Sequence, residues 1–111
     1  MLDVLAGKKG YDELPPISVE MHLTNQCNLN CGWCTDRALR DKTSMSREVA
    51  SRVIGELTAY GVGVTIEGGG EPAMHTAWRP ICERAASQKA HLGLITNGVV
   101  MVGASTVDAF R

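Results

Sequence analysis

Hydrophobic and polar residues alternate along residues 17–23, in the order Ile, Ser, Val, Glu, Met, His and Leu. A period of two is typical of a β-strand with two different faces. Two further short stretches, 62–67 and 92–96, are rich in β-forming residues and end in turn-forming sequence. The pattern therefore predicts three strands. Residues 1–16 show no clear period and end in two prolines, which predicts an irregular N-terminal arm.

The stretch between the first two predicted strands contains an amphipathic helix. Ser46 is a suitable N-cap, Glu48 lies near the positive end of the helix, and Gly61 follows the last helical residue, Tyr60. Its apolar residues recur at helical spacing and are expected to share a buried face: Val49, Val53, Ile54 and Leu57.

A second helix is predicted between the second and third strands. Pro80 is tolerated only in its first turn, so the helix begins shortly before this residue. A third helix, capped by Ser105 or Thr106, would run to Arg111. The apolar face of the second helix repeats at helical spacing: Trp78, Ile81, Cys82, Ala85 and Ala86.

The order strand, helix, strand, helix, strand predicts an α/β fold with a parallel sheet and helices on its outer face. In such folds the chemistry collects at the carboxyl ends of the strands. A cysteine-rich segment follows the first strand, residues 68–70 are three glycines after the second, and Thr96, Asn97 and Gly98 follow the third. These three segments are expected to share one rim.

Composition narrows the class of protein. The chain has 111 residues, 44% of them hydrophobic, and a net charge of -1, which suits one globular domain without the basic excess of a nucleic-acid binder. The longest apolar run, residues 99–102, is far below the ~20 residues of a membrane helix. In a secretion signal, positive charges precede the apolar run. Here an acidic residue comes before the short apolar run and two lysines come after it, so we expect a cytoplasmic protein.

Cys27, Cys31 and Cys34 are separated by three and two residues, among asparagines and a glycine that favour a loop. One loop with this spacing can wrap three thiolates around an iron–sulfur cluster and leave one iron open. Two alternatives are a zinc knot completed by Cys82 or a histidine, and three thiols on one helix face. Cys82 lies on an apolar stripe, where core packing is the usual role of a free cysteine.

The Cys-x3-Cys-x2-Cys spacing, with Trp33 before the third cysteine, resembles that of the radical S-adenosylmethionine (radical SAM) family over about residues 17–98. Gly69, Gly70 and Glu71 match the family's Gly-Gly-Glu motif, and the segment around Asn97 is similar to a common ending of its third strand. The resemblance implies a 4Fe-4S cluster whose open iron binds S-adenosyl-L-methionine, and cleavage to a 5′-deoxyadenosyl radical that abstracts hydrogen from a substrate. It also implies the cofactor-binding residues: Trp33, Gly69, Gly70, Glu71 and Asn97.

The resemblance further implies a partial (β/α) barrel of about three units, since the family barrel has about six. Residues 17–111 are therefore expected to be the N-terminal part of a radical SAM core, truncated before the later strands. A low-potential electron donor of the flavodoxin or ferredoxin type is the implied partner. The alternatives are a non-enzymatic cluster-binding fragment or subunit, and a small zinc-binding interaction module.

Other polar residues are open to two interpretations. Glu20 and His22, on the polar face of the first strand, either point into a barrel lumen near substrate or form structural hydrogen bonds. His75 fits a helix entry better than a catalytic group. Three arginines after the cysteines are expected to be solvated and are left out of the site: Arg37, Arg40 and Arg47.

Overall fold

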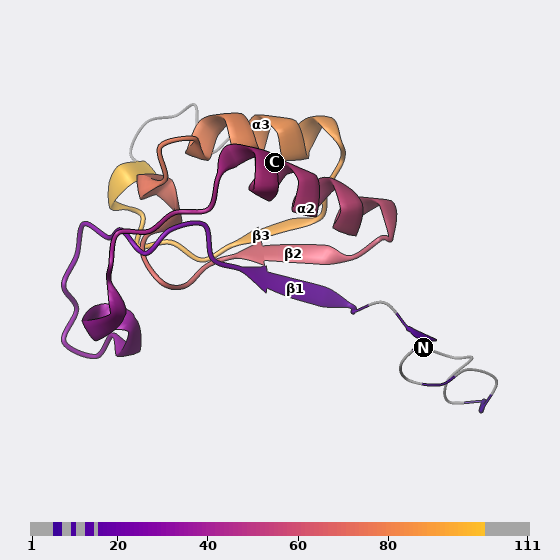
Figure 1. Ribbon diagram of the computed structural model, residues 1–111, viewed down its shortest axis with the longest axis horizontal. Coiled ribbons are helices and arrows are strands. Elements are labelled where there is room, and N and C mark those ends of the chain that lie inside the picture. Colours follow the sequence, from indigo (N-terminus) through magenta and orange to yellow (C-terminus); the bar gives the residue numbers. More distant parts are fainter. Residues whose placement is uncertain (1–5, 8–9, 11–12, 15, 102–111) are drawn as a thin grey trace.

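The computed structural model describes residues 6–7, 10, 13–14 and 16–101. Its centre is a sheet of three parallel strands in the order β1-β2-β3 (Figure 1). The predicted fold class is therefore confirmed. The helix predicted after residue 105 and most of the N-terminal arm lie outside the described residues. The strands are shorter than their apolar patterns, because the outer residues already lead into loops: β1 (Ser18–Met21), β2 (Gly63–Ile66) and β3 (Leu92–Leu94).

Two helices, α2 (Arg47–Ala59) and α3 (Trp78–Ser87), cover one face of the sheet (Figure 1). Glu20 in β1 and His22, which directly follows this strand, are exposed. The alternation of the first strand thus separates a helix-covered face from a polar one, as predicted. The buried cluster between sheet and helices contains Met21, Leu23, Ala50, Ile54, Val64, Ile66, Trp78, Ile81, Cys82 and Ala85.

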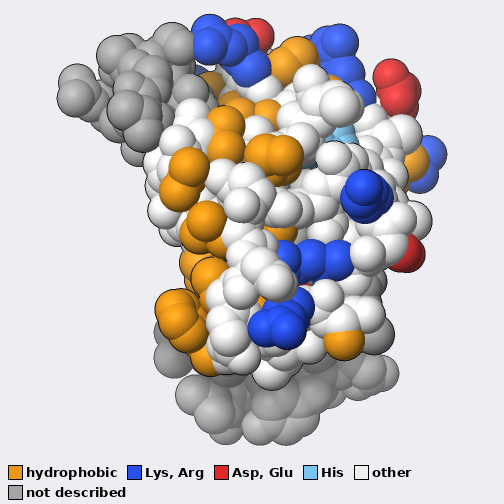
Figure 2. Space-filling view, turned by 90° about the vertical axis from the view of Figure 1, so that its left-hand side faces the viewer, with side chains coloured by type: hydrophobic (Ala, Val, Ile, Leu, Met, Phe, Trp, Pro, Cys, Tyr) orange, Lys and Arg blue, Asp and Glu red, His pale blue; other side chains and the backbone are white. Residues whose placement is uncertain are grey.

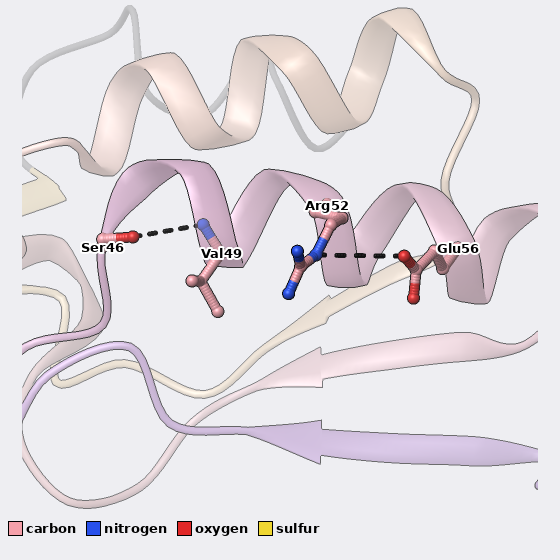
Figure 3. Close-up of polar contacts among 4 residues, drawn as sticks. All are labelled: Ser46, Val49, Arg52 and Glu56. Atoms are coloured by element: carbon pink, nitrogen blue, oxygen red, sulfur yellow. Dashed lines mark hydrogen bonds and ion pairs between the residues drawn. The ribbon is translucent and has the colours of Figure 1, made fainter.

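Helix α2 begins and ends where its sequence signals predict. Ser46 Oγ accepts a hydrogen bond of 3.2 Å from Val49 N (Figure 3). Gly61 adopts a φ of +70° just after the helix end. Arg52 and Glu56 form an exposed (i, i+4) ion pair of 3.9 Å, a contact that contributes little to stability.

One predicted core position of α2 is wrong. Val49 is 40% exposed, because the buried stripe of the helix passes instead through Ala50 and Ile54. Val53 and Leu57 are partly buried and pack against this core, as expected.

Helix α3 carries Pro80 as its third residue, in the first turn, where a missing N–H breaks no intrahelical hydrogen bond. Ala86 was predicted on the buried stripe, but it is exposed because the stripe ends at Ala85. Among the described residues, none of the helices has the length and apolar character needed to cross a membrane.

His75 links the entry of α3 to the segment before α2. Its side chain is buried, and Nδ1 accepts a hydrogen bond of 3.0 Å from Ala77 N. Because Nδ1 accepts, Nε2 carries the proton and donates to Met45 O at 2.7 Å. The helix-entry interpretation of His75 is confirmed.

Replacing the cap of α2 should lower stability. We expect Ser46→Ala to reduce the free energy of unfolding by about 1 kcal/mol, because Val49 N loses its acceptor. Chemical denaturation followed by circular dichroism measures the change. Ser51→Ala is the control: Ser51 lies inside the helix, where alanine is the better helix former. An equal loss in both variants would contradict the role of the cap.

Candidate functional site

The loops after the three strands surround a hollow of about 450 Å³. Figure 2 looks onto this end of the molecule, where hydrophobic side chains gather along one side and Lys and Arg side chains lie beside them. The predicted shared rim is thus formed. All the residues predicted to bind metal or cofactor line the hollow: Cys27, Cys31, Trp33, Cys34, Gly69, Gly70, Glu71 and Asn97.

The cysteine loop is closed at its base, which we call the neck, by contacts between residues 23–26 and 41–45. Thr24 and Ser44 form an isolated antiparallel bridge, and their hydroxyl oxygens lie 2.7 Å apart. Next to this bridge, Met45 N donates a hydrogen bond of 2.8 Å to Leu23 O. Thr24 is only 3% exposed, so the neck is anchored in the core.

Asp41 ties the second side of the neck together. Its Oδ1 accepts hydrogen bonds from Asn25 Nδ2 at 2.9 Å, from Thr43 N at 2.9 Å and from Thr43 Oγ1 at 2.7 Å. These donors, Asn25 first and then Thr43, lower the pKa of Asp41 from 3.8 to about 2, since they favour the charged carboxylate. No pattern in the sequence indicates this role of Asp41.

Within the loop, the three cysteines are half-buried and free. Leu29 N donates to Cys27 Sγ at 3.5 Å, and Cys34 N donates to Cys31 O at 3.2 Å, so two turns present the thiols to the hollow. The predicted loop is confirmed, and the helix-face alternative is wrong because the segment is not helical. A 3₁₀ helix, η2 (Thr35–Leu39), follows the third cysteine. Trp33 is 86% exposed at the rim of the hollow.

Arg40 belongs to the site although it was expected to be solvated. Its side chain is half-buried, lines the hollow, and donates from Nη2 to Cys34 Sγ at 3.3 Å. Nη1 donates to Leu29 O. No local pattern marks this arginine, because its neighbours are brought near only by the turn of η2.

The triple glycine after β2 packs against the entry to the cysteine loop. Gly70 N donates to Thr24 O at 2.8 Å, and Glu71 N donates to Gln26 O at 2.7 Å. A Cβ at Gly70 would lie 1.9 Å from Gln26 O, so no larger residue fits. The close neighbour on the Cβ side of Gly70 is therefore the backbone of the cysteine loop.

Glu71 joins the second and third strand ends. Glu71 is 3% exposed; Oε1 accepts from Thr96 Oγ1 at 2.6 Å and Oε2 accepts from Asn97 N at 2.8 Å. Asn97 Nδ2 in turn donates to Asn28 Oδ1 in the cysteine loop at 2.8 Å. Hydrogen bonds therefore connect all three segments of the rim.

Comparison with protein families agrees with this geometry. A family model described as the radical SAM superfamily matches residues 21–111. The chain belongs to the radical SAM superfamily. The match begins at the last residue of β1 and includes the cysteine loop, the glycine turn and the end of β3.

Several curated relatives are members of the same group of enzymes. The chain is 33% identical over 87 residues to GTP 3′,8-cyclase of Synechocystis sp., which covers 75% of this chain and 27% of that protein. It is 35% identical over 86 residues to PqqA peptide cyclase of Methylobacterium sp., with 76% and 23% covered. Mycofactocin maturase MftC of Mycolicibacterium smegmatis is 31% identical over 93 residues, with 83% and 23% covered. The chain thus spans about a quarter of the length of these relatives.

A solved radical SAM structure has the same fold. The crystal structure of Streptococcus suis SuiB bound to precursor peptide SuiA superposes with a TM-score of 0.71 at 24% identity. The match covers 85% of this chain and 21% of SuiB. The three parallel strands and two helices are therefore part of a radical SAM fold.

Cys82 is not suited to complete a zinc site with the three loop cysteines. Burial, and to a smaller extent Glu83, raise the pKa of Cys82 to about 12, whereas a metal ligand must be a thiolate. Cys82 is 1% exposed within the hydrophobic core, so its predicted packing role is confirmed. In the described part of the chain, no group of three or more His, Cys, Asp or Glu side chains is arranged to hold a single metal ion. Cysteine thiolates are the usual ligands of iron–sulfur clusters, which are larger than a single metal ion.

A side chain at Gly70 should displace the cysteine loop. We expect Gly70→Ala to lower the free energy of unfolding by on the order of 1–3 kcal/mol, because its Cβ would overlap Gln26 O. Urea denaturation measures the change. Gly32→Ala is the matched control, since a Cβ there meets nothing within 4 Å. Equal stability of the Gly70 variant and wild type would contradict the close backbone contact.

The neck should weaken in acid. Because the pKa of Asp41 is lowered in the folded protein, its carboxylate contributes stability that is full above about pH 4 and is lost as the pH falls toward about 2. Urea denaturation from about pH 7 to about pH 2 should therefore show a difference between wild type and Asp41→Asn that shrinks with acidity. A difference that stays constant would contradict the assigned pKa.

Proposed function

We propose that Cys27, Cys31 and Cys34 bind a 4Fe-4S cluster and that its open iron faces the hollow, where S-adenosyl-L-methionine binds. The observation that carries this proposal is that the half-buried thiols line one hollow together with the ends of all three strands. The hollow, about 450 Å³, lies within the range of small-molecule sites. Family membership supports the same cofactors.

The remaining rim residues have complementary roles in this proposal. Exposed Trp33 provides an aromatic wall beside the third cysteine, and the backbone of Gly69 and Gly70 forms the floor. Glu71 places a carboxylate at the wall, which suits the ammonium group of the cofactor, while its oxygens hold Thr96 and Asn97. The described side chains thus position the cofactor rather than react with substrate.

The bound cluster, when reduced, supplies the electron that cleaves S-adenosyl-L-methionine and gives the 5′-deoxyadenosyl radical. A low-potential one-electron donor of the flavodoxin or ferredoxin type is the proposed partner. We propose that residues 17–111 form the N-terminal part of a radical SAM core, supported by relatives of which the match covers only about a quarter. We assign hydrogen abstraction from a substrate to a complete radical SAM core, of which these residues would form a part.

Cluster binding is tested by anaerobic reconstitution with iron and sulfide. We expect about four irons per chain for wild type, and a large loss of iron for Cys27→Ala, Cys31→Ala and Cys34→Ala. Cys82→Ala is the matched control and should keep its iron, because Cys82 does not line the hollow. Electron paramagnetic resonance of the reduced protein identifies the cluster. Iron content unaffected by all three loop substitutions would contradict the assignment.

The same preparation separates the alternative functions. After addition of S-adenosyl-L-methionine and dithionite, formation of 5′-deoxyadenosine supports an enzyme. Iron without the nucleoside supports a non-enzymatic cluster-binding fragment or subunit. Zinc bound in place of iron supports the small interaction module.

A further inference from the structure

Arg40 connects two parts of the cysteine loop. Its Nη2 donates to Cys34 Sγ at 3.3 Å, and its Nη1 donates to Leu29 O, between the first two cysteines. One guanidinium therefore contacts both the third thiol and the backbone near the first. Its Nε is buried and has no hydrogen-bond partner in the described part of the chain.

Arg40 is half-buried. Its side chain lines the main hollow and also a smaller one of about 290 Å³, which Cys27 and Lys42 also line. The carboxylate of Asp41, the next residue, accepts hydrogen bonds from Asn25 and Thr43. Among the described residues Arg40 forms no ion pair with a carboxylate, so its charge is available to the sulfur.

A cation hydrogen-bonded to a ligand sulfur should affect the electron affinity of a cluster. Arginine side chains are cationic, and hydrogen bonds from a charged donor are stronger than those between neutral groups. Hydrogen bonds to sulfur and local charge tune the potentials of iron–sulfur clusters. Reduction adds one negative charge to the cluster, so a nearby cation stabilises the reduced state.

We propose that Arg40 is a positioning residue that raises the reduction potential of the cluster through Cys34 and fixes the loop through Leu29. The inference rests on the proposed function, because it requires the cluster bound by the three cysteines. The electron itself comes from an external one-electron reductant. Arg40 would thus make the cluster easier for such a donor to reduce.

The test is a redox titration of the reconstituted full chain, with dithionite as reductant and electron paramagnetic resonance as readout. We expect Arg40→Gln to shift the reduction equilibrium by on the order of tenfold toward the oxidised cluster, which for a one-electron couple is about 59 mV to more negative potential. Arg40→Lys should shift it less in the same direction, because lysine keeps the charge but cannot bridge two acceptors. Arg37→Gln is the matched control and should leave the potential unchanged, since Arg37 is exposed and does not line the hollow.

The proposed cluster and the role of Arg40 can be contradicted separately. Wild-type protein without a cluster would overturn the proposed function. A wild-type cluster with the same potential in Arg40→Gln would overturn the role of Arg40 alone. If Arg40→Gln loses its cluster, Arg40→Lys decides, and a potential equal to that of wild type would overturn the proposal.

Discussion

The rim of the hollow depends on one close contact between two pieces of backbone. The glycine turn after β2 lies against the entry to the cysteine loop, where Gly70 N and Glu71 N donate to Thr24 O and Gln26 O. Even a methyl group at Gly70 would separate them. Because this contact fixes the loop relative to the sheet, the thiols, the glycine turn and the end of β3 share one hollow.

The features that the sequence predicted well are local ones. The Ser46 cap, the turn at Gly61 and the position of Pro80 each depend on a few neighbouring residues, and the structure has all three. The parallel order of the strands follows from the alternation of elements, and the cysteine spacing led to the superfamily that the comparisons show. Patterns that span one element or one motif can be interpreted without knowledge of the rest of the chain.

The features that were missed join residues far apart in sequence. Asp41 meets Asn25 across 16 residues, and Glu71 meets Asn97 across 26. Arg40 is separated from Cys34 by only six residues, but the contact requires the turn of η2, which no periodic pattern announced. Val49 was misassigned for a related reason: helical spacing defines a stripe, but packing against the sheet decides where the edge of the stripe lies.

The closed neck should affect the energetics of the proposed cluster binding. Bringing the ends of a flexible chain together has an entropic cost that grows with its length, and here hydrogen bonds between residues 23–26 and 41–45 meet that cost within the polypeptide. In zinc fingers, by contrast, ion binding and folding are a single equilibrium. Because the loop is already closed in the folded chain, most of the binding energy of the proposed cluster should contribute to affinity rather than to folding. Cluster binding and folding are then expected to be separate events.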